Sequence, residues 1–337
     1  MPRVIVIGAH GFFGQLATLR LRESGLEPIG ASRRAGISEL HVDADDPGSI
    51  RSVLQAGDIV LDAAGPFQTR TTALVEAATE VGFDVVDLSD SFAYAARILA
   101  MRDRIDRTGA RILTSCSSIS AVSAALVRLS GVAAPSRVSV FLAPASRATA
   151  NPATIRSFLA SVGRPVTVRR DARVVSLIGW RLSRRFAWPG RGNRRAFLTE
   201  SADALWLPGI WPSLRDVDFW VDTQMPLANV ILQASARIPV GPAAVRALSG
   251  MGAALARRFG AAAGAFAVEV EGQGGSVVAR SLWGNARSYV IAVAPAVLAV
   301  RALAAGRLPE TGLVPVDRQV DPQELMTYLA AAGIEAR

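Results

Sequence analysis

The order of apolar and polar positions in the first 115 residues predicts strands that alternate with helices. Residues 3–7 form an apolar, β-branched run that ends at Gly8, which is typical of a buried strand. Residues 15–24 then carry leucines at helical spacing, with Gly25 as a stop signal. The two patterns recur, with strands predicted at 3–7, 27–32, 41–43, 58–63, 84–88 and 111–115 and helices at 15–24, 47–55, 69–81 and 92–107. This alternation predicts an α/β fold with a doubly wound parallel sheet.

The alternation stops beyond residue 131. Residues 138–142 predict a strand, and Asn151 with Pro152 predicts the start of a helix that runs to residue 162. Residues 164–195 are rich in arginine and show no regular pattern, whereas residues 217–221 (VDFWV) are strand-like. We therefore expect a first domain at 1–131, a second at 132–285 and a C-terminal segment at 286–337.

The last third of the chain predicts a hairpin followed by helices. Two alternating runs, 266–271 and 277–282, flank a glycine turn, which is typical of a β-hairpin. Phe266, Val268 and Val270 would share one face of it. A long apolar helix is predicted at 286–305 and an end helix at 322–332.

Composition excludes a disordered chain and several kinds of chemistry. The 337 residues are half apolar, so a disordered chain is excluded. All 37 basic residues are arginine and the net charge is +9; without lysine the chain has no Schiff-base nucleophile. The one cysteine, Cys116, cannot form an intramolecular disulfide, and two histidines, His10 and His41, make a metal site improbable, so we expect none.

Two features of the chain predict a cytoplasmic location. Its first ten residues lack the apolar region and cleavage site of a secretory signal. The longest apolar run, 289–300, is 12 residues long and contains Pro295, which is too short to span a bilayer.

Glycines follow the first predicted strand at the spacing of a dinucleotide-binding turn. Gly8, Gly11 and Gly14 form a GxxGxxG pattern between a strand and a helix. Glycine allows the tight turn and the close approach of backbone to a pyrophosphate, and the helix N-terminus favours its negative charge. A glycine-rich turn without a nucleotide is the alternative, but it does not explain this register.

The end of the second predicted strand favours NADP(H) as the cofactor. An acidic residue there would bind the ribose hydroxyls of NAD. This chain has Ser32, Arg33 and Arg34 instead, and guanidinium groups suit a 2′-phosphate. Two solvated arginines are the alternative.

Several segments resemble the saccharopine-dehydrogenase-like (saccharopine-reductase-like) NADP-binding oxidoreductases. They are GAHGFFG, ASRR, VDADDPGSIRSVLQAGDIVLDAAGPFQ and GFDVVDLSD in the first 125 residues, and more loosely ALWLPGIWPSLRDVDFWV, VEVEGQGG and GLVPVDRQVDPQELMTYLAAAGI. The resemblance implies a Rossmann domain, a second α+β domain with a mixed sheet, and C-terminal helices that pack back on the first domain. Similar proteins include imine reductases and enoyl reductases that act on polyketide-type lipids, so the fold does not define the substrate.

The resemblance also implies cofactor contacts. The residues that would line the pyrophosphate are Gly8, Gly11, Phe12, Phe13 and Gly14. Those that would meet the adenosine end are Ser32, Arg33, Arg34 and Asp43. Those that would border the nicotinamide end and the reacting centre are Ala64, Gly65, Pro66, Phe67, Asp87, Ser89 and Asp90.

The catalytic residues are less clear from the sequence. Hydride transfer often needs a proton donor, and Tyr94 and Asp90 are our candidates, with Cys116 as a third. A helix residue with a bonded hydroxyl is the alternative for Tyr94, and a small buried side chain is the alternative for Cys116.

Segment 164–195 raises the question of partners, because it holds ten arginines and one acid, Asp171. An acyl carrier or phosphorylated substrate, an anionic membrane surface and nucleic acid are the three functional readings, and an exposed loop is the fourth. No zinc-finger or RNA-binding motif supports nucleic acid. A homodimer is a further expectation.

The leading hypothesis is an NADP-dependent oxidoreductase acting on a small or carrier-linked carbonyl, imine or enoyl substrate. A non-catalytic NADP-binding regulator is the alternative.

Overall fold

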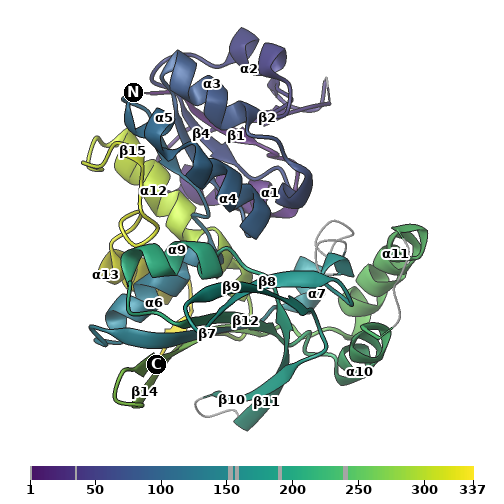
Figure 1. The fold of residues 1–337 in the computed structure, drawn as a ribbon. Coiled ribbons are helices and arrows are strands. Elements are labelled where there is room, and N and C mark those ends of the chain that lie inside the picture. The colour runs from purple at the N-terminus through teal and green to yellow at the C-terminus, as the bar shows by residue number, and fades with distance from the viewer. Residues whose placement is uncertain (1, 35, 151–154, 156–158, 189–191, 238–241) are drawn as a thin grey trace. The chain divides into compact units, whose positions relative to one another are not determined.

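The chain forms two compact units. The computed structural model describes residues 2–34, 36–150, 155, 159–188, 192–237 and 242–337, apart from the side chains of 242–249. Unit 1 comprises Met1–Val122 and Ala292–Asp321, and unit 2 comprises Ser123–Ile291 and Pro322–Arg337 (Figure 1). The predicted start of a helix at Asn151 lies outside the described residues.

A parallel sheet forms the centre of unit 1. Its described strands are β1 (Val4–Ile7), β2 (Ile29–Ser32), β3 (Leu40–His41), β4 (Ile59–Asp62), β5 (Asp84–Asp87), β6 (Arg111–Leu113) and β15 (Gly312–Leu313). They follow the order β15-β6-β5-β4-β1-β2-β3, and every pair is parallel. Ile7 is paired with Ala31 on one side and Asp62 on the other, and Asp62 is paired with Asp87. The register therefore aligns the carboxyl ends of β2, β1, β4 and β5 in one row.

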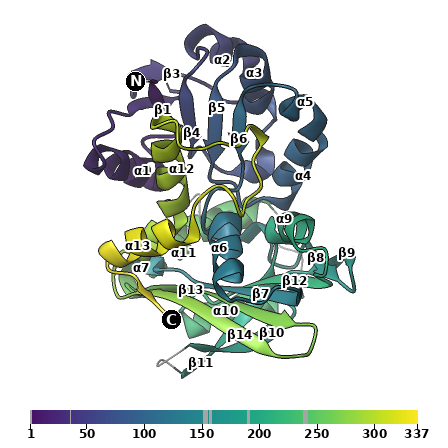
Figure 2. The same ribbon diagram turned by 90° about the vertical axis from the view of Figure 1, so that its left-hand side faces the viewer.

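Helices cover both faces of this sheet, which confirms the doubly wound prediction. They are α1 (Phe12–Glu23), α2 (Pro47–Val53), η1 (Phe67–Thr69), α3 (Ala73–Val81), α4 (Phe92–Ala100), α5 (Arg102–Asp106), η2 (Ser118–Val122) and α12 (Ala294–Ala304). α12 packs on α1, β4 and β5, while α3 packs on α2 and β5. Figure 2 shows α1 and α12 on one side of the sheet and α3 to α5 on the other. The helix predicted at 92–107 is two helices that meet at Met101.

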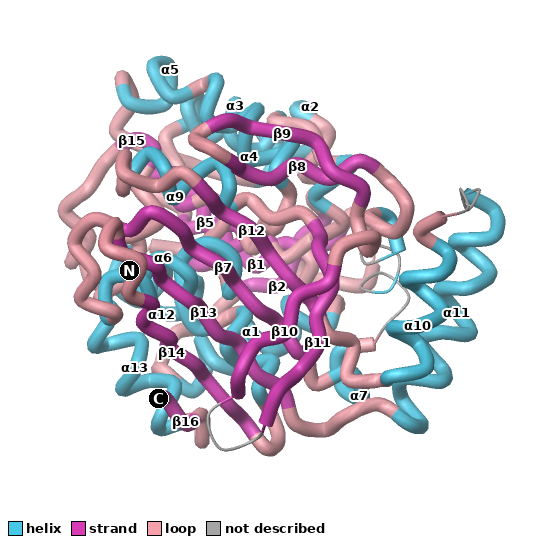
Figure 3. Tube along the Cα trace, turned by 60° about the horizontal axis from the view of Figure 1, so that its bottom comes forward, coloured by secondary structure: helices cyan, strands magenta, loops and turns pink. Residues whose placement is uncertain are grey.

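The sheet of unit 2 is mixed, as expected. Its described strands are β7 (Pro135–Ala143), β8 (Pro165–Arg170), β9 (Arg173–Ile178), β10 (Ser183–Trp188), β11 (Gly192–Thr199), β12 (Asp216–Val221), β13 (Gly264–Gly272), β14 (Val277–Gly284) and β16 (Glu335–Ala336). Their order is β10-β11-β12-β7-β13-β14-β16, with β8 paired to β12 and β9 (Figure 3). β7 and β12 are parallel, and the other pairs are antiparallel. The hairpin of β13 and β14 confirms that prediction.

The prediction that residues 164–195 are irregular is wrong, because they form β8 to β11. Trp180, Phe186 and Trp188 in this segment are buried. Arginines on both faces of these strands hide the period-two pattern: Arg184 pairs with Glu269, whereas Arg185 is exposed. The aromatic residues are core, and they cannot anchor a membrane surface there.

Helices cover one face of the unit 2 sheet. The helices around it are α6 (Ser123–Leu129), α7 (Ser146–Thr149), α9 (Asp203–Ile210), α10 (Pro226–Ser235), α11 (Pro242–Phe259), η3 (Ser288–Ala292) and α13 (Pro322–Ala331). α6 contacts β13 and β14, α9 contacts β12, and α13 contacts α6. The sequence did not predict α9 to α11, and the long helix predicted at 286–305 is η3 followed by the shorter α12. The return of the C-terminal segment to the first unit is seen for α12 and β15, while α13 and β16 belong to unit 2.

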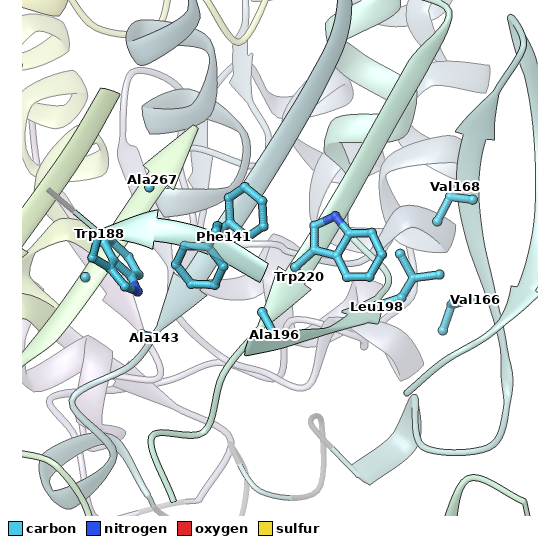
Figure 4. Close-up of a cluster of buried hydrophobic side chains, with 11 residues drawn as sticks. Phe141, Ala143, Val166, Val168, Trp188, Ala196, Leu198, Trp220 and Ala267 are labelled. Carbon is cyan, nitrogen blue, oxygen red and sulfur yellow. The ribbon is translucent and has the colours of Figure 1, made fainter. Parts of the chain in front are cut away.

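An apolar cluster lies on the other face of this sheet (Figure 4). The rings of Phe141 in β7 and Phe186 in β10 stack with centroids 4.2 Å apart, and Trp188 meets Phe186 edge-on at 4.8 Å. Because β10 is three places from β7 in the sheet order, this contact means that the β10–β11 end folds over the sheet.

Candidate nucleotide-binding site

Glycine is required at two positions of the turn after β1. Gly8 has φ +78°, and a Cβ added there would lie 2.9 Å from backbone atoms of Ala63 and Ala64. A Cβ on Gly14 would lie 2.1 Å from the carbonyl oxygen of Gly8. The turn therefore packs tightly against both α1 and the segment after β4.

Gly11 differs from these two glycines, because it is exposed and a side chain there would be less crowded. It is exposed, and an added Cβ would meet only the carbonyl oxygen of Gly8, at 3.2 Å. It is also the N-cap of α1 and offers no side chain to cap the first turn. The first N–H groups of a helix lack intrahelical partners and carry its positive dipole end. The exposed N-terminus of this 12-residue helix fits a pyrophosphate.

The end of β2 presents two arginines. Arg33 and Arg34 are exposed, and neither forms an ion pair with a described residue. The Ser32 hydroxyl donates to the carbonyl oxygen of Arg34 at 2.9 Å, and His41 Nε2 lies 3.1 Å from the carbonyl oxygen of Arg33. These contacts fix the backbone while the guanidinium groups face solvent.

Two carboxylates near this edge make backbone contacts. Asp43, predicted to lie near adenine, accepts a hydrogen bond from the N–H of Asp45 at 3.1 Å. Glu39 accepts one from the N–H of Gly30 at 3.4 Å, so an acid does approach β2.

A buried ion pair ties the strand ends together. Arg70 Nη2 lies 2.9 Å from Asp62 Oδ2, and Arg70 also donates to the carbonyl oxygen of Ala64 at 2.7 Å and to Asp45 at 3.0 Å. The Asp62 side chain is fully buried and that of Arg70 is 6% exposed. Burial alone would lower the pKa of Arg70, but the Asp62 carboxylate outweighs it and raises that pKa, so the arginine stays charged.

Asp45 is the exposed end of this network. Burial alone would raise its pKa, yet the Thr71 N–H and the charge of Arg70 hold that pKa below its ordinary value. Arg70 therefore joins the loop after β3 to the loop after β4, the strand next to β1.

Asp87, at the end of β5, is fully buried. Its Oδ1 accepts from the N–H groups of Ser89 and Ser115, both at 2.9 Å. Burial raises its pKa from 3.8 to about 6, against the pull of those N–H groups and the Thr114 hydroxyl.

Tyr94 packs beside this carboxyl group and is also fully buried. Its ring lies 5.4 Å from that of Phe67, and its hydroxyl has no hydrogen-bond partner among the described atoms. Burial, then the charges of Asp87 and Asp62, raise the pKa of Tyr94 well above its ordinary value. The hydroxyl therefore stays protonated and out of contact with solvent.

The remaining candidates divide into exposed and buried groups. Asp90 is exposed and accepts from the Gln68 amide at 3.4 Å. Gly65 and Pro66 are exposed, and Ala64 is partly so. Ser89, Phe67 and Cys116 are buried, and burial raises the pKa of the Cys116 thiol well above its ordinary value.

The register therefore brings the predicted cofactor residues to one edge of the sheet, but only some are accessible. Gly11, Arg33, Arg34, Pro66 and Asp90 present exposed groups there. The exact cofactor contacts and the catalytic roles of Tyr94 and Asp90 stay predictions.

Sequence reasoning missed the Asp62–Arg70 pair. A signal was present, because Asp62 ends an otherwise apolar strand, IVLD, and a buried carboxylate needs a cation or several donors. The spacing of residues along the chain does not identify which arginine pairs with Asp62.

Two kinds of feature are absent from the described residues, a cluster of metal ligands and a helix that could cross a membrane. Among the described residues no three His, Cys, Asp or Glu side chains gather as a metal site. No described helix combines the length and hydropathy needed to cross a bilayer.

This arrangement of sheet, glycine turn and helix is a Rossmann-type α/β fold, and a solved structure matches the fold across the whole chain. Apo saccharopine dehydrogenase (L-Glu forming) of Saccharomyces cerevisiae matches with a TM-score of 0.62 and 13% identity, covering 100% of this chain and 99% of that one. The chain thus resembles saccharopine dehydrogenase in fold, which confirms the resemblance found in the sequence at that level.

Other comparisons are weaker. A probable mitochondrial saccharopine dehydrogenase-like oxidoreductase of Arabidopsis thaliana is 29% identical over 83 residues, which span 24% of this chain and 18% of the relative. An engineered D-amino acid dehydrogenase bound to NADP+ has a TM-score of 0.45 and 16% identity, with 98% of each chain covered. No protein-family model matches the sequence.

Proposed function

We propose that this protein is an NADP-dependent oxidoreductase that transfers a hydride between nicotinamide and a small or carrier-linked carbonyl, imine or enoyl substrate. The observation that carries the proposal is the turn from Gly8 to Gly14, which packs tightly at both ends and is exposed at Gly11, where α1 begins. The fold shared with saccharopine dehydrogenase supports the same class.

Each part of the edge has a role in binding the nucleotide. The first turn of α1, which follows Gly11, would hold the pyrophosphate, because the N–H of Gly11 itself donates to the carbonyl oxygen of Gly8 at 2.8 Å. Arg33 and Arg34 would hold the 2′-phosphate, because their guanidinium groups are exposed and unpaired among the described residues. Arg70 would position the loops after β3 and β4 without touching the cofactor, since it is buried and its donors are used by Asp62, Ala64 and Asp45.

The nicotinamide would supply or accept the hydride. Of our two catalytic candidates, Asp90 is the one whose carboxylate reaches solvent. Tyr94 lies beneath Phe67 with its hydroxyl buried, so its role would be to support η1 and the β5 end. We therefore assign proton transfer to Asp90 or to a group on the substrate.

The glycine turn is tested by comparing two alanine variants. Gly11→Ala should leave unit 1 folded, because the φ of −73° suits any residue and the added Cβ would crowd one atom only, the Gly8 carbonyl oxygen at 3.2 Å, but it should weaken NADPH binding at least about tenfold, or about 1.4 kcal/mol. Gly14→Ala should instead destabilise unit 1 through its overlap with Gly8. Nicotinamide fluorescence and thermal melts measure the two effects.

Gly109→Ala is the matched control, because nothing lies within 4 Å of its added Cβ. Unchanged NADPH affinity in a folded Gly11→Ala variant would show that the turn is not the nucleotide site.

Cofactor preference is tested at the end of β2. Arg33→Ala/Arg34→Ala should cost NADPH about 1.5–3 kcal/mol of binding free energy, the range for hydrogen bonds to charged groups, and leave NADH almost unchanged. Arg22→Ala/Arg107→Ala removes two exposed arginines of the same unit and should affect neither cofactor. Equal losses for NADPH and NADH in the first variant would refute the NADP assignment.

The non-catalytic regulator remains the second candidate, because Tyr94 and Cys116 are buried and cannot donate a proton to a substrate. Turnover with NADPH on a panel of imines, enoyl thioesters and keto acids separates the two. Tight NADPH binding without oxidation of the cofactor across the panel would favour the regulator.

A further inference from the structure

Helix α10 of unit 2 exposes an apolar stripe. Leu227, Val230 and Ile231 are 73%, 62% and 55% exposed, and their spacing places them on one face. The opposite face is packed: Asn229 is buried and donates to the Asp222 carboxylate at 2.8 Å. The outward aliphatic side chains are therefore not part of the core of this unit.

Helix α11 repeats the arrangement. Met251, Leu255 and Phe259 follow each other at intervals of four and are about half or more exposed. Ala253 and Ala256 are buried on the other side, and the helix packs on α7. Figures 1 and 3 draw α10 and α11 next to each other at the end of unit 2 away from β14. Of the eleven large apolar side chains described as exposed, six lie on these two helices.

The chain segment that carries this patch has charged residues of one sign only. Residues 223–268 contain four arginines and no aspartate or glutamate. Arg237, Arg257 and Arg258 are exposed, and none forms an ion pair with a described residue. Arg147 adds a fourth exposed guanidinium beside the end of α11, where its Nε donates to the carbonyl oxygen of Gly260 at 3.1 Å.

We propose that the outer faces of α10 and α11 dock this protein onto an anionic lipid bilayer. Apolar side chains at helical spacing enter the boundary between headgroups and acyl chains, and arginines pair with lipid phosphates. A second copy fits less well, because a two-fold contact through this face would set arginine against arginine. The proposal is independent of the oxidoreductase function, and it places the predicted membrane surface outside segment 164–195.

The experiment uses the full chain and sedimented vesicles of phosphatidylcholine with or without phosphatidylserine. Binding should be at least tenfold tighter with phosphatidylserine, and it should weaken as salt rises because exposed charges are screened. Leu227→Gln/Ile231→Gln/Phe259→Gln should reduce binding at least tenfold. Arg257→Gln/Arg258→Gln should remove most of the preference for phosphatidylserine.

Two matched variants on the same unit serve as controls. Val174→Gln/Leu182→Gln/Val277→Gln changes three exposed apolar residues outside the patch, and Arg173→Gln/Arg185→Gln removes two exposed arginines of segment 164–195. Both should bind vesicles like the unchanged protein. Unchanged melting temperature and NADPH affinity in every variant show that fold and cofactor site are intact.

Three results would overturn the proposal. They are absence of vesicle binding by the unchanged protein, equal losses in patch and control variants, and a concentration-dependent dimer in sedimentation that only the patch variant loses. The last result would assign the face to a second copy of the chain.

Discussion

Arginine–carboxylate pairs occur in both units, but their surroundings differ. In unit 1, Arg70 and Asp62 are almost completely removed from solvent. In unit 2, Arg137 pairs with Asp216 at 3.2 Å and Glu271 at 3.3 Å on the sheet, yet 42% of the arginine side chain remains exposed. The distances between arginine and carboxylate are similar in the two units. The pairs therefore differ mainly in how far water screens their charges.

The stability of the fold depends on the buried pair much more than on the exposed one. An exposed pair is screened and contributes little, whereas a buried charge that loses its partner is strongly destabilising. Arg70 also donates to Asp45 and to the carbonyl oxygen of Ala64, so it connects two loops through one side chain. The unit 2 pair joins neighbouring strands that the sheet already connects.

The largest expected effect tests this difference directly. Arg70→Met should lower the free energy of unfolding by about 3–5 kcal/mol, because it leaves the Asp62 carboxylate buried and unpaired. Arg137→Met should cost only about 0–1 kcal/mol. Urea unfolding monitored by circular dichroism measures both.

Asp62→Asn/Arg70→Met provides the control, because it removes both charges and should recover part of the stability lost in the single variant. Similar losses for Arg70→Met and Arg137→Met would break the comparison and remove the positioning role of Arg70.

Sequence patterns predicted unit 1 better than unit 2 for a physical reason. Buried parallel strands are continuous apolar runs, and the glycine turn has a fixed spacing, so β1, α1 and the row of strand ends follow from local signals. In unit 2, β10 (SRRFAW) and β11 (GNRRAFLT) carry arginine on both faces, which hides the strand pattern. α10 and α11 are apolar on the outside as well as inside, so the usual amphipathic signal is reduced.

The candidate site likewise contains features that follow from local sequence patterns and features that depend on distant packing. Gly11, Arg33 and Arg34 lie where local spacing placed them, at exposed ends of strand and turn. Burial of Tyr94 and Phe67 could not be predicted, because it depends on η1 packing on α4, a contact that no single motif contains. The Asp62–Arg70 pair likewise forms across a turn whose path the sequence does not specify.

A smaller effect is expected at Asp87 of unit 1, where the free energy of unfolding should depend on pH. Burial raises its folded pKa to about 6 from an ordinary 3.8, so the folded chain keeps this proton to higher pH than the unfolded chain. Stability from this group is therefore fully present below about pH 4 and is lost as pH rises through about 6, by roughly 3 kcal/mol in total. Asp87→Asn keeps an oxygen for the N–H groups of Ser89 and Ser115 and cannot ionise. The unfolding free energy of the variant should rise relative to the unchanged protein between pH 4 and pH 7, measured in urea at each pH. Asp90→Asn, an exposed carboxylate on the next loop, should show no such trend. A difference between Asp87→Asn and the unchanged protein that stays constant from pH 4 to 7 would mean that water or a bound cation reaches Asp87. In that case the charge of Asp87 would be screened, as the charges of the exposed ion pairs in unit 2 are.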